Sequence, residues 1–230
     1  MLIRALASDY DGTLATDGEV GETTLRALER LKASGRKLLM VTGRELPDLK
    51  RVFGHLGLFD AVVAENGALL YRPDLGEERL LAAPPPPAFI AALKRRGIEP
   101  LAVGRSIVAT SSDHVAEVEA AIGELGIGWR TILNKDSVMC LPLGVDKASG
   151  LTAALAELGL APASVLGVGD AENDLPFLAI CGLSAAVANA LPQVKAAADI
   201  VTEGEAGAGV AWLIDRLLAD ELSPQAARAC

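Results

Sequence analysis

The stretch Leu2-Ile3-Arg4-Ala5-Leu6-Ala7-Ser8-Asp9-Tyr10-Asp11-Gly12-Thr13 decides the fold of this chain. Residues 2–8 are apolar enough for a buried strand, and two aspartates follow at once. Ligand sites in open α/β sheets lie at the carboxyl ends of the strands, so chemistry is expected here. Carboxylates at i and i+2 can project to one side of an extended chain, and their repulsion favours a cation or a shared proton. Taken alone, the pattern fits an Asp-Gly turn with solvated acids equally well.

Outward from this stretch, apolar runs and helical patterns alternate, and the alternation predicts a doubly wound, Rossmann-like parallel sheet with helices on both faces. Residues 68–71 and 79–82 flank a Pro-Asp-Leu-Gly turn and indicate a hairpin. An Ala-rich tail from Ser223 is expected to fray. Further strands are predicted at 37–42, 61–64, 165–168, 184–187 and 200–201, and helices at 22–34, 46–56, 147–158, 175–180, 191–197 and 210–218.

A different unit interrupts this alternation. Four consecutive prolines at 84–87 stiffen the chain and mark a linker. After them the order αββαββ is predicted, with helices at 88–96 and 113–125 and strands at 99–103, 106–110, 129–133 and 137–141. We therefore expect a discontinuous α/β core, residues 1–82 and 142–230, and an inserted α+β domain, residues 83–141.

Composition excludes several classes of function. The 230 residues are 51% apolar and carry a formal net charge of -9, which argues against nucleic-acid or anionic-membrane partners because phosphate contacts need Lys and Arg. The longest weakly polar stretch, 178–191, is shorter than the roughly 20 residues that span a bilayer. With two histidines, a His-rich zinc site lacks its ligands. Three widely spaced cysteines fit a reducing cytoplasm better than a disulfide framework.

Two further strand ends carry candidate polar groups. The strand at 37–42 runs into Thr42-Gly43-Arg44, where a hydroxyl and backbone N–H groups could accept a phosphate; an ordinary N-cap is the simpler interpretation. The strand at 165–168 runs into Gly169-Asp170-Ala171-Glu172-Asn173-Asp174. If the sheet order reverses there, Asp170 and Asp174 lie beside the first strand. An acidic loop capping the next helix is the alternative.

A lysine begins the helix that follows the inserted domain. Lys147 stands in the first turn, with Asp146 as the expected N-cap. A cation at a helix N-terminus is unfavourable to the helix dipole, which suggests a role beyond helix stability, although solvated lysines are common. Together the strand ends offer carboxylates, a hydroxyl and a lysine, the groups that phosphoryl transfer needs for a nucleophile, a magnesium site and phosphate donors.

In these motifs, the sequence closely resembles the haloacid dehalogenase superfamily of phosphohydrolases. The resemblance is carried, in order along the chain, by Asp-x-Asp-Gly-Thr at 9–13, Thr42, Lys147 and Gly-Asp-x-x-Asn-Asp at 169–174. The αββαββ insert resembles the small class-two cap of the Cof-type branch, and Glu65-Asn66-Gly67-Ala68 resembles the same branch. The short cap and the length of 230 residues resemble the phosphoglycolate phosphatases of this branch.

By that resemblance, Asp9 attacks phosphorus to form a phosphoaspartate, and Asp11 protonates the leaving oxygen and then activates water. Lys147 neutralises charge on the nucleophile and the phosphate. The remaining implied roles are Mg²⁺ binding by Asp9, the Asp11 carbonyl, Asp170 and Asp174, and phosphoryl binding by Thr42, Gly43 and Asn173.

The resemblance implies a small phosphorylated metabolite as substrate, with phosphoglycolate or a sugar phosphate favoured, and a monomer or homodimer. Candidate leaving-group contacts are Arg44, Asn66, Arg105, Arg130 and Lys135, although a solvated surface role is at least as probable for the last three. Two alternatives stay open: a phosphomutase or other phosphotransferase, and a non-catalytic phosphate-binding switch like a response-regulator receiver. Receivers carry the accepting aspartate after the third strand, where this chain has Glu65-Asn66.

Overall fold

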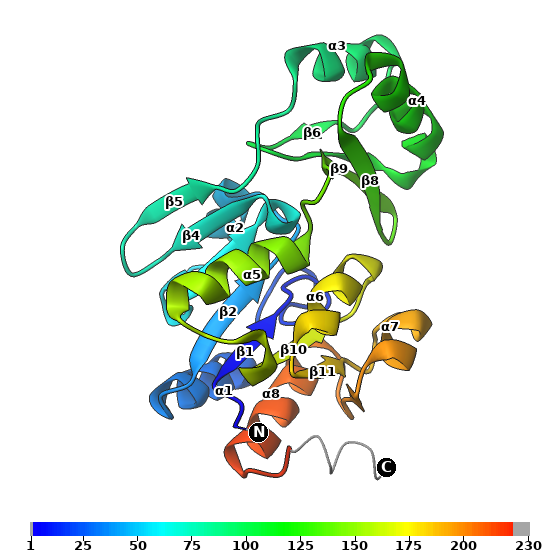
Figure 1. Cartoon of the computed structure of the whole chain (residues 1–230). Helices are drawn as coiled ribbons and strands as arrows, with labels where there is room; N and C mark the ends of the chain where they lie inside the picture. Colours follow the sequence, from blue (N-terminus) through cyan, green and yellow to red (C-terminus); the bar gives the residue numbers. More distant parts are fainter. Residues whose placement is uncertain (1, 223–230) are drawn as a thin grey trace.

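An eight-stranded sheet forms the larger of two lobes (Figure 1), in the order β12-β11-β10-β1-β2-β3-β4-β5. The computed structural model describes residues 2–222, so the tail predicted to fray lies outside the described residues. The strands are β1 (Ala5–Ser8), β2 (Lys37–Val41), β3 (Ala61–Ala64), β4 (Leu69–Arg72), β5 (Glu77–Leu80), β10 (Val165–Gly169), β11 (Leu183–Ala186) and β12 (Ile200–Val201).

The sheet is parallel from β12 to β3, and the hairpin β4–β5 continues it antiparallel at one edge. The doubly wound α/β fold predicted from the alternation of strands and helices is confirmed. Strand order reverses between β1 and β10, where Ala7 lies opposite Gly167. Such a reversal opens a crevice at the carboxyl ends of the strands, the usual ligand position in this class of sheet.

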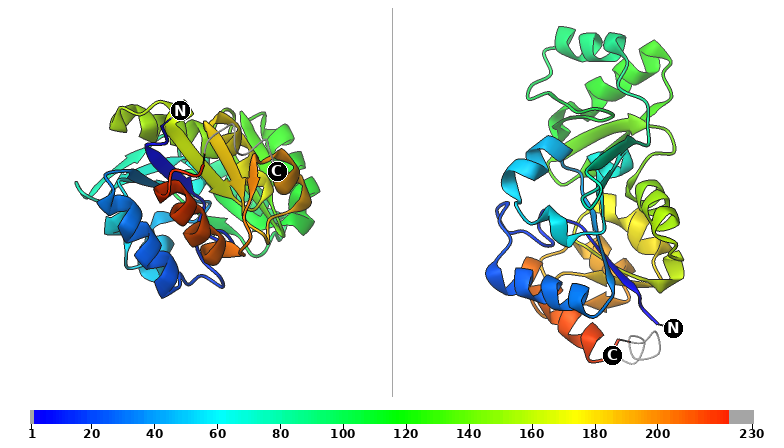
Figure 2. Two further views of the ribbon diagram at one scale, coloured as in Figure 1. Left: turned by 90° about the horizontal axis from the view of Figure 1, so that it is seen from below. Right: turned by 90° about the vertical axis from the view of Figure 1, so that its left-hand side faces the viewer.

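Helices cover both faces of the sheet. α1 (Glu22–Ala33) packs on α8 (Ala206–Leu218) on one face, and α5 (Lys147–Leu158) packs on α6 (Leu175–Ile180) on the other (Figure 2). In α1 the buried residues are Thr24, Ala27, Leu28 and Leu31, a three-to-four-residue spacing that turns one helix face to the core. The shorter α2 (Leu46–Val52) and α7 (Pro192–Ala197) complete the lobe.

The smaller lobe, here called the cap, has its own sheet in the order β6-β7-β9-β8 and its own apolar core, which includes Phe89, Leu93, Val118 and Trp129. The domain boundaries at 82/83 and 141/142 stay a prediction. The elements of the cap are α3 (Pro87–Arg95), β6 (Ala102–Val103), β7 (Val108–Ser111), α4 (Val115–Leu125), β8 (Trp129–Asn134) and β9 (Ser137–Pro142).

Three predicted elements are shorter in the structure by three residues or more. The strand predicted over 2–8 covers Ala5–Ser8. The helix predicted over 46–56 ends at Val52, two residues before Gly54, and a short 3₁₀ turn, Leu56–Leu58, follows. The strand predicted over 99–103 covers Ala102–Val103 alone, because Pro100 has no N–H to donate to a neighbouring strand. Within residues 2–222, none of the helices has the length and apolar character needed to cross a membrane.

Candidate active site

The carboxyl ends of three neighbouring strands bring the predicted site residues together. β1 lies between β10 and β2 and pairs with both in parallel. Asp9 follows β1, Thr42 follows β2, and Asp170 follows β10. Residues more than 100 positions apart in the sequence therefore share one edge of the sheet, close to the point where the strand order reverses.

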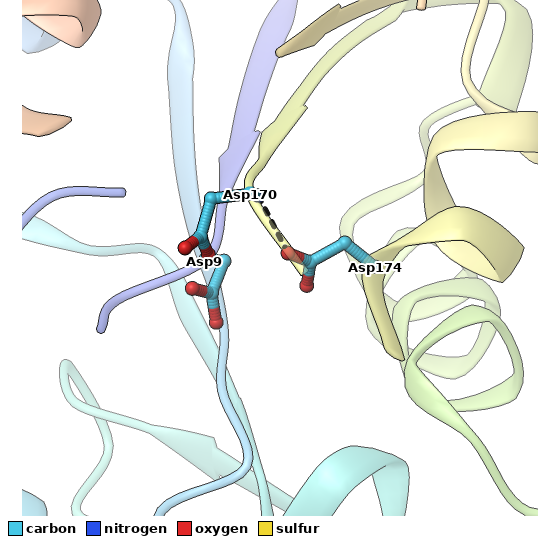
Figure 3. A group of neighbouring side chains, drawn as sticks. All are labelled: Asp9, Asp170 and Asp174. Carbon is cyan, nitrogen blue, oxygen red and sulfur yellow. Dashed lines mark hydrogen bonds between the residues drawn. The ribbon is translucent and has the colours of Figure 1, made fainter. Parts of the chain in front are cut away.

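Asp9, Asp170 and Asp174 form a buried acidic cluster (Figure 3) in which one carboxylate oxygen from each lies within 4.8 Å of the others. Asp174 is held by its Oδ2, which accepts the backbone N–H groups of Asp170 at 2.8 Å and Ala171 at 2.9 Å. Carboxylate oxygens are the donors that Mg²⁺ takes in proteins. The donor set therefore fits the predicted ion.

A glycine allows the Asp9–Thr13 turn to approach this cluster. Gly12 has φ +79°, and a Cβ at this position would lie 2.4 Å from Asp170 Oδ2. A larger residue would therefore be strained in its backbone and would collide with an acid of the cluster. Thr13 donates its hydroxyl to Asp170 Oδ1 at 3.2 Å, which ties the same turn to β10.

Lys147 reaches the cluster from the first turn of α5. Its Nζ donates to Asp9 Oδ1 and to Asp174 Oδ1, each at 2.6 Å, and its side chain is 1% exposed. The expected N-cap is present, since the Asp146 side chain accepts the N–H of Ser149 and the Ser149 hydroxyl accepts the N–H of Asp146. The helix start, and with it Lys147, is thereby held in place.

Burial and charge oppose each other in this cluster. Burial raises the pKa of the Asp9 carboxyl, Lys147 lowers it in part, and the Asp174 and Asp170 carboxylates raise it further. Burial works to lower the pKa of the Lys147 ammonium, but the Asp174 and Asp9 carboxylates outweigh it and raise that pKa. Lys147 is thus a cation held among three acids, and a further cation bound here would favour the ionised form of Asp9.

Asp11 lies outside the acidic cluster and pairs with Arg44. Its carboxylate accepts two hydrogen bonds, from Arg44 Nε and Nη2, at 2.7 Å each, and Arg44 Nη1 donates to Asp48 at 2.6 Å. The hydrogen bond to Asp11 is the main cause of the raised pKa of the guanidinium. The Asp11 side chain is 44% exposed, so this carboxylate is open to the solvent side of the site.

The predicted phosphoryl-binding residues lie around the end of β2. Thr42 is buried, and its hydroxyl accepts the N–H of Arg44 at 3.1 Å. Asn173 Nδ2 donates to Asn66 Oδ1 at 3.1 Å. Within the described residues, Asn173 Oδ1 and Asn66 Nδ2 are buried without a hydrogen-bond partner. Unpaired buried amide groups are costly, so a polar ligand here would be stabilising.

A cavity of about 330 Å³ lies between this edge of the sheet and the β8–β9 turn of the cap. Lys135, in that turn, donates its Nζ to Asp170 Oδ2 at 2.5 Å and its backbone N–H to Glu172 at 3.2 Å. Met139 covers the loop at residues 42–44, here called the phosphate loop because it holds predicted phosphoryl-binding residues: a Cβ on Gly43 would lie 2.6 Å from Met139 Cε. The lining residues are Asp9, Asp11, Gly43, Arg44, Asn134, Lys135, Asp136, Ser137, Met139 and Asn173.

Of the five candidate leaving-group contacts, Arg44 and Lys135 line the cavity and three do not. Asn66 is buried behind Asn173, Arg105 pairs with Glu78, and Arg130 pairs with Asp146 at 2.8 Å. Met139 and residues 134, 136 and 137 of the lining were not predicted. Nothing in their local sequence marks them, because they reach the site by the folding of the cap over the core.

A family model described as haloacid dehalogenase-like hydrolase matches residues 6–117 and 130–214. The chain belongs to this family. Phosphoglycolate phosphatase of Aeropyrum pernix is 30% identical over 234 residues, with 96% of each chain covered. Phosphoglycolate phosphatase of Methanopyrus kandleri is 32% identical over 225 residues, covering 92% of this chain and 95% of its own.

Solved structures agree on the fold. Thermoplasma acidophilum 0175 superposes with a TM-score of 0.79 at 19% identity, covering 95% of this chain and 99% of its own. The HAD subclass IIB sugar phosphatase BT4131 superposes with a TM-score of 0.76 at 19% identity and the same coverage. The predicted hydrolase of this superfamily, with a Cof-type cap and a likeness to phosphoglycolate phosphatases, is confirmed.

Proposed function

We propose that this chain is a Mg²⁺-dependent phosphatase that hydrolyses a small anionic phosphomonoester, with 2-phosphoglycolate as the first candidate. The observation that carries the proposal is the buried contact of Lys147 with Asp9 inside the acidic cluster, at the reversal of strand order. Because Lys147 offsets the negative charge of the Asp9 carboxylate, this carboxylate can approach a phosphate dianion as a nucleophile. The related phosphoglycolate phosphatases support the substrate class.

In the proposed reaction, Asp9 attacks phosphorus while the bond from phosphorus to the leaving oxygen breaks. Asp11, a carboxylate paired with Arg44 in this structure, has to take up a proton from solvent and turn toward the substrate, and it then gives that proton to the leaving oxygen. Asp11 then takes a proton from water, and the water oxygen displaces the Asp9 carboxylate from phosphorus. Phosphate leaves, and both aspartates return to their starting state.

The other residues bind and neutralise the phosphoryl group. Thr42 Oγ1, the Gly43 N–H and the Asn173 amide would hold its oxygens, and Lys147 would balance charge as the new bond forms. Asp9, Asp170, Asp174 and the carbonyl oxygen of Asp11 would hold Mg²⁺, which when bound screens nucleophile from substrate.

A single cation that the cap contributes, Lys135, favours glycolate over a neutral sugar as leaving group. Two cations, Lys135 and Arg44, line the cavity with three acids, which are Asp9, Asp11 and Asp136. Arg44 is paired with Asp11, and Lys135 bonds to Asp170, from which it would turn to the leaving group. A carboxylate at the end of a short leaving group would accept a charge-assisted hydrogen bond from Lys135, the stronger class of such bonds. A sugar offers neutral hydroxyl groups in place of this carboxylate. Sugar phosphates are therefore the second candidate class.

Phosphate release from a panel of phosphomonoesters with Mg²⁺ tests the proposal. We expect release from 2-phosphoglycolate to exceed release from glucose 6-phosphate, and Asp9→Asn to lower it about 10³-fold or more. Asp74→Asn, on an exposed acid in the β4–β5 turn, is the matched control and should retain activity. Failure to release phosphate from any ester would refute the proposal.

The same assay separates the alternatives. A phosphomutase would convert one ester into its isomer with no net phosphate release, and a switch protein would retain the phosphoryl group on Asp9. The cytoplasmic location and the monomeric or homodimeric state stay predictions.

A further inference from the structure

The turn at Glu65, Asn66 and Gly67 connects two separate parts of the molecule, the cap and the loop at residues 42–44. Glu65 is fully buried, and its two carboxylate oxygens accept backbone N–H groups from the cap: Arg105 on Oε1 at 3.1 Å and Ser106 on Oε2 at 2.7 Å. A buried carboxylate is costly unless its oxygens are hydrogen-bonded. The turn between β6 and β7 of the cap supplies both of these bonds.

The cap turn fits closely onto this carboxylate. A Cβ on Gly104 would lie 3.0 Å from Glu65 Oε2, so the absence of a side chain lets the turn approach. Ser106 also donates its hydroxyl to the Ala82 carbonyl at 2.9 Å, beside the linker into the cap. Arg105 forms an exposed ion pair with Glu78. The turn is therefore seated on the core next to one of the two linkers.

The backbone of the same residue is attached to the phosphate loop. The N–H of Glu65 donates to the Arg44 carbonyl at 2.9 Å, and the N–H of Asn66 donates to the Thr42 carbonyl at 3.0 Å. Glu65 and Asn66 have φ of +50° and +54°. Left-handed conformations in consecutive non-glycine residues cost free energy and persist where the surrounding contacts hold them. The two bonds to residues 42–44 are such contacts.

We propose that Glu65 is a positioning residue that seats the cap on the phosphate loop, so that the cap side of the cavity is held in register with the phosphoryl site. The inference rests on the proposed hydrolysis of phosphomonoesters. Leaving the Glu65 carboxylate without its two donors is unfavourable, so the carboxylate favours the cap orientation in which residues 104–106 are seated. Lys135, in the turn at the far end of β9, and Met139, opposite Ala109 within the cap sheet, then face the leaving group.

Glu65→Gln tests the inference, because the amide keeps the size of the side chain but replaces one acceptor by a donor. Glu78→Gln is the matched control, since it removes an exposed contact to the same cap turn. Hydrogen exchange at the amides of Arg105 and Ser106 is the first measurement. We expect protection to fall at least tenfold in Glu65→Gln and by less than threefold in the control.

The second measurement is the ratio of kcat/KM for 2-phosphoglycolate to kcat/KM for acetyl phosphate, whose leaving group has no charged end to meet the cap. We expect Glu65→Gln to lower this ratio at least tenfold, which a loss of stability alone does not do. Gly104→Ala adds a methyl group against the Glu65 carboxylate from the cap side, so it should also lower the kcat/KM ratio. This variant replaces Glu65→Gln in the test if Glu65→Gln does not fold.

Unchanged amide protection in Glu65→Gln overturns the inference, and so does lost protection with an unchanged kcat/KM ratio. If the wild-type chain hydrolyses neither ester, the proposed function fails. Amide protection then still decides whether Glu65 seats the cap turn.

Discussion

Gly150 lies in α5, one turn after Lys147, and Gly150→Ala places two physical effects in opposition. Alanine is favoured over glycine in a helix interior by about 1 kcal/mol. A Cβ at Gly150, however, would lie 2.5 Å from Val63 Cγ1 and 2.6 Å from Gly67 Cα. The second contact is with backbone of a buried turn, which cannot rotate away. Overpacking of this kind costs about 1–3 kcal/mol, and contacts this short put it at the upper end.

We therefore expect Gly150→Ala to lower the free energy of unfolding by about 2 kcal/mol, and Tm by about 4–8 °C for a chain of this size. Because α5 carries Lys147, relief of the contact moves the Lys147 ammonium away from Asp9. A misplacement of about 1 Å at a reacting group can cost about 100-fold in rate, so kcat should fall at least tenfold.

Gly123→Ala is the control for helix propensity. Gly123 lies in α4 of the cap, where an added Cβ would meet nothing within 4 Å. We expect the free energy of unfolding of this variant to rise by about 1 kcal/mol and its activity to stay unchanged. Urea unfolding followed by tryptophan fluorescence measures the free energy of unfolding of both variants. Trp212 in α8 reports on the core, and Trp129 in β8 reports on the cap. A Gly150→Ala variant as stable as the wild type, or destabilised with unchanged kcat, would refute the reasoning.

Three further predictions follow from the site and the core. Lys135→Gln should lower kcat/KM for 2-phosphoglycolate about tenfold, the value of one charge-assisted hydrogen bond, and should lower kcat/KM for glucose 6-phosphate less than threefold. Equal losses for the two substrates in steady-state assays would contradict the role of the Lys135 charge. EDTA should abolish phosphate release and added Mg²⁺ should restore it, and release that persists after dialysis against EDTA would exclude the metal. Burial raises the thiol pKa of Cys140 and of Cys181 to about 12, so in a Cys230→Ser variant at pH 8 neither should react with a disulfide reagent until urea unfolds the chain. Rapid reaction of the native protein would contradict the raised thiol pKa.

Much of the core could be predicted because its signals are local. Residues 5–8 and 165–169 are apolar runs, and parallel strands place their carboxyl ends at one edge, so Asp9 and Asp170 were expected to meet. The N-cap at Asp146 follows from the preference of short acids for helix starts, and it placed Lys147 in the first turn. The structure brings these groups together as the motifs indicated.

On the cap side of the site, the structure places the candidate residues in different surroundings. Arg105 was a candidate for the cavity but pairs with Glu78, whereas Met139 covers Gly43 without any sequence signal. Arg44 was expected to meet the leaving group; it lines the cavity, and in this structure it also holds Asp11. Side-chain type alone does not say which of several exposed cations faces inward.

By itself, the sequence determined the order of strands and helices, the acids at the strand ends and the lysine at the start of α5, because hydrophobic periodicity and capping act between neighbouring residues. The tertiary structure alone decided how the cap meets the core. Glu65 reaches Ser106 across 41 positions and Lys135 reaches Asp170 across 35. These contacts depend on the packing of two separate cores against each other, and no local pattern of residues encodes that packing.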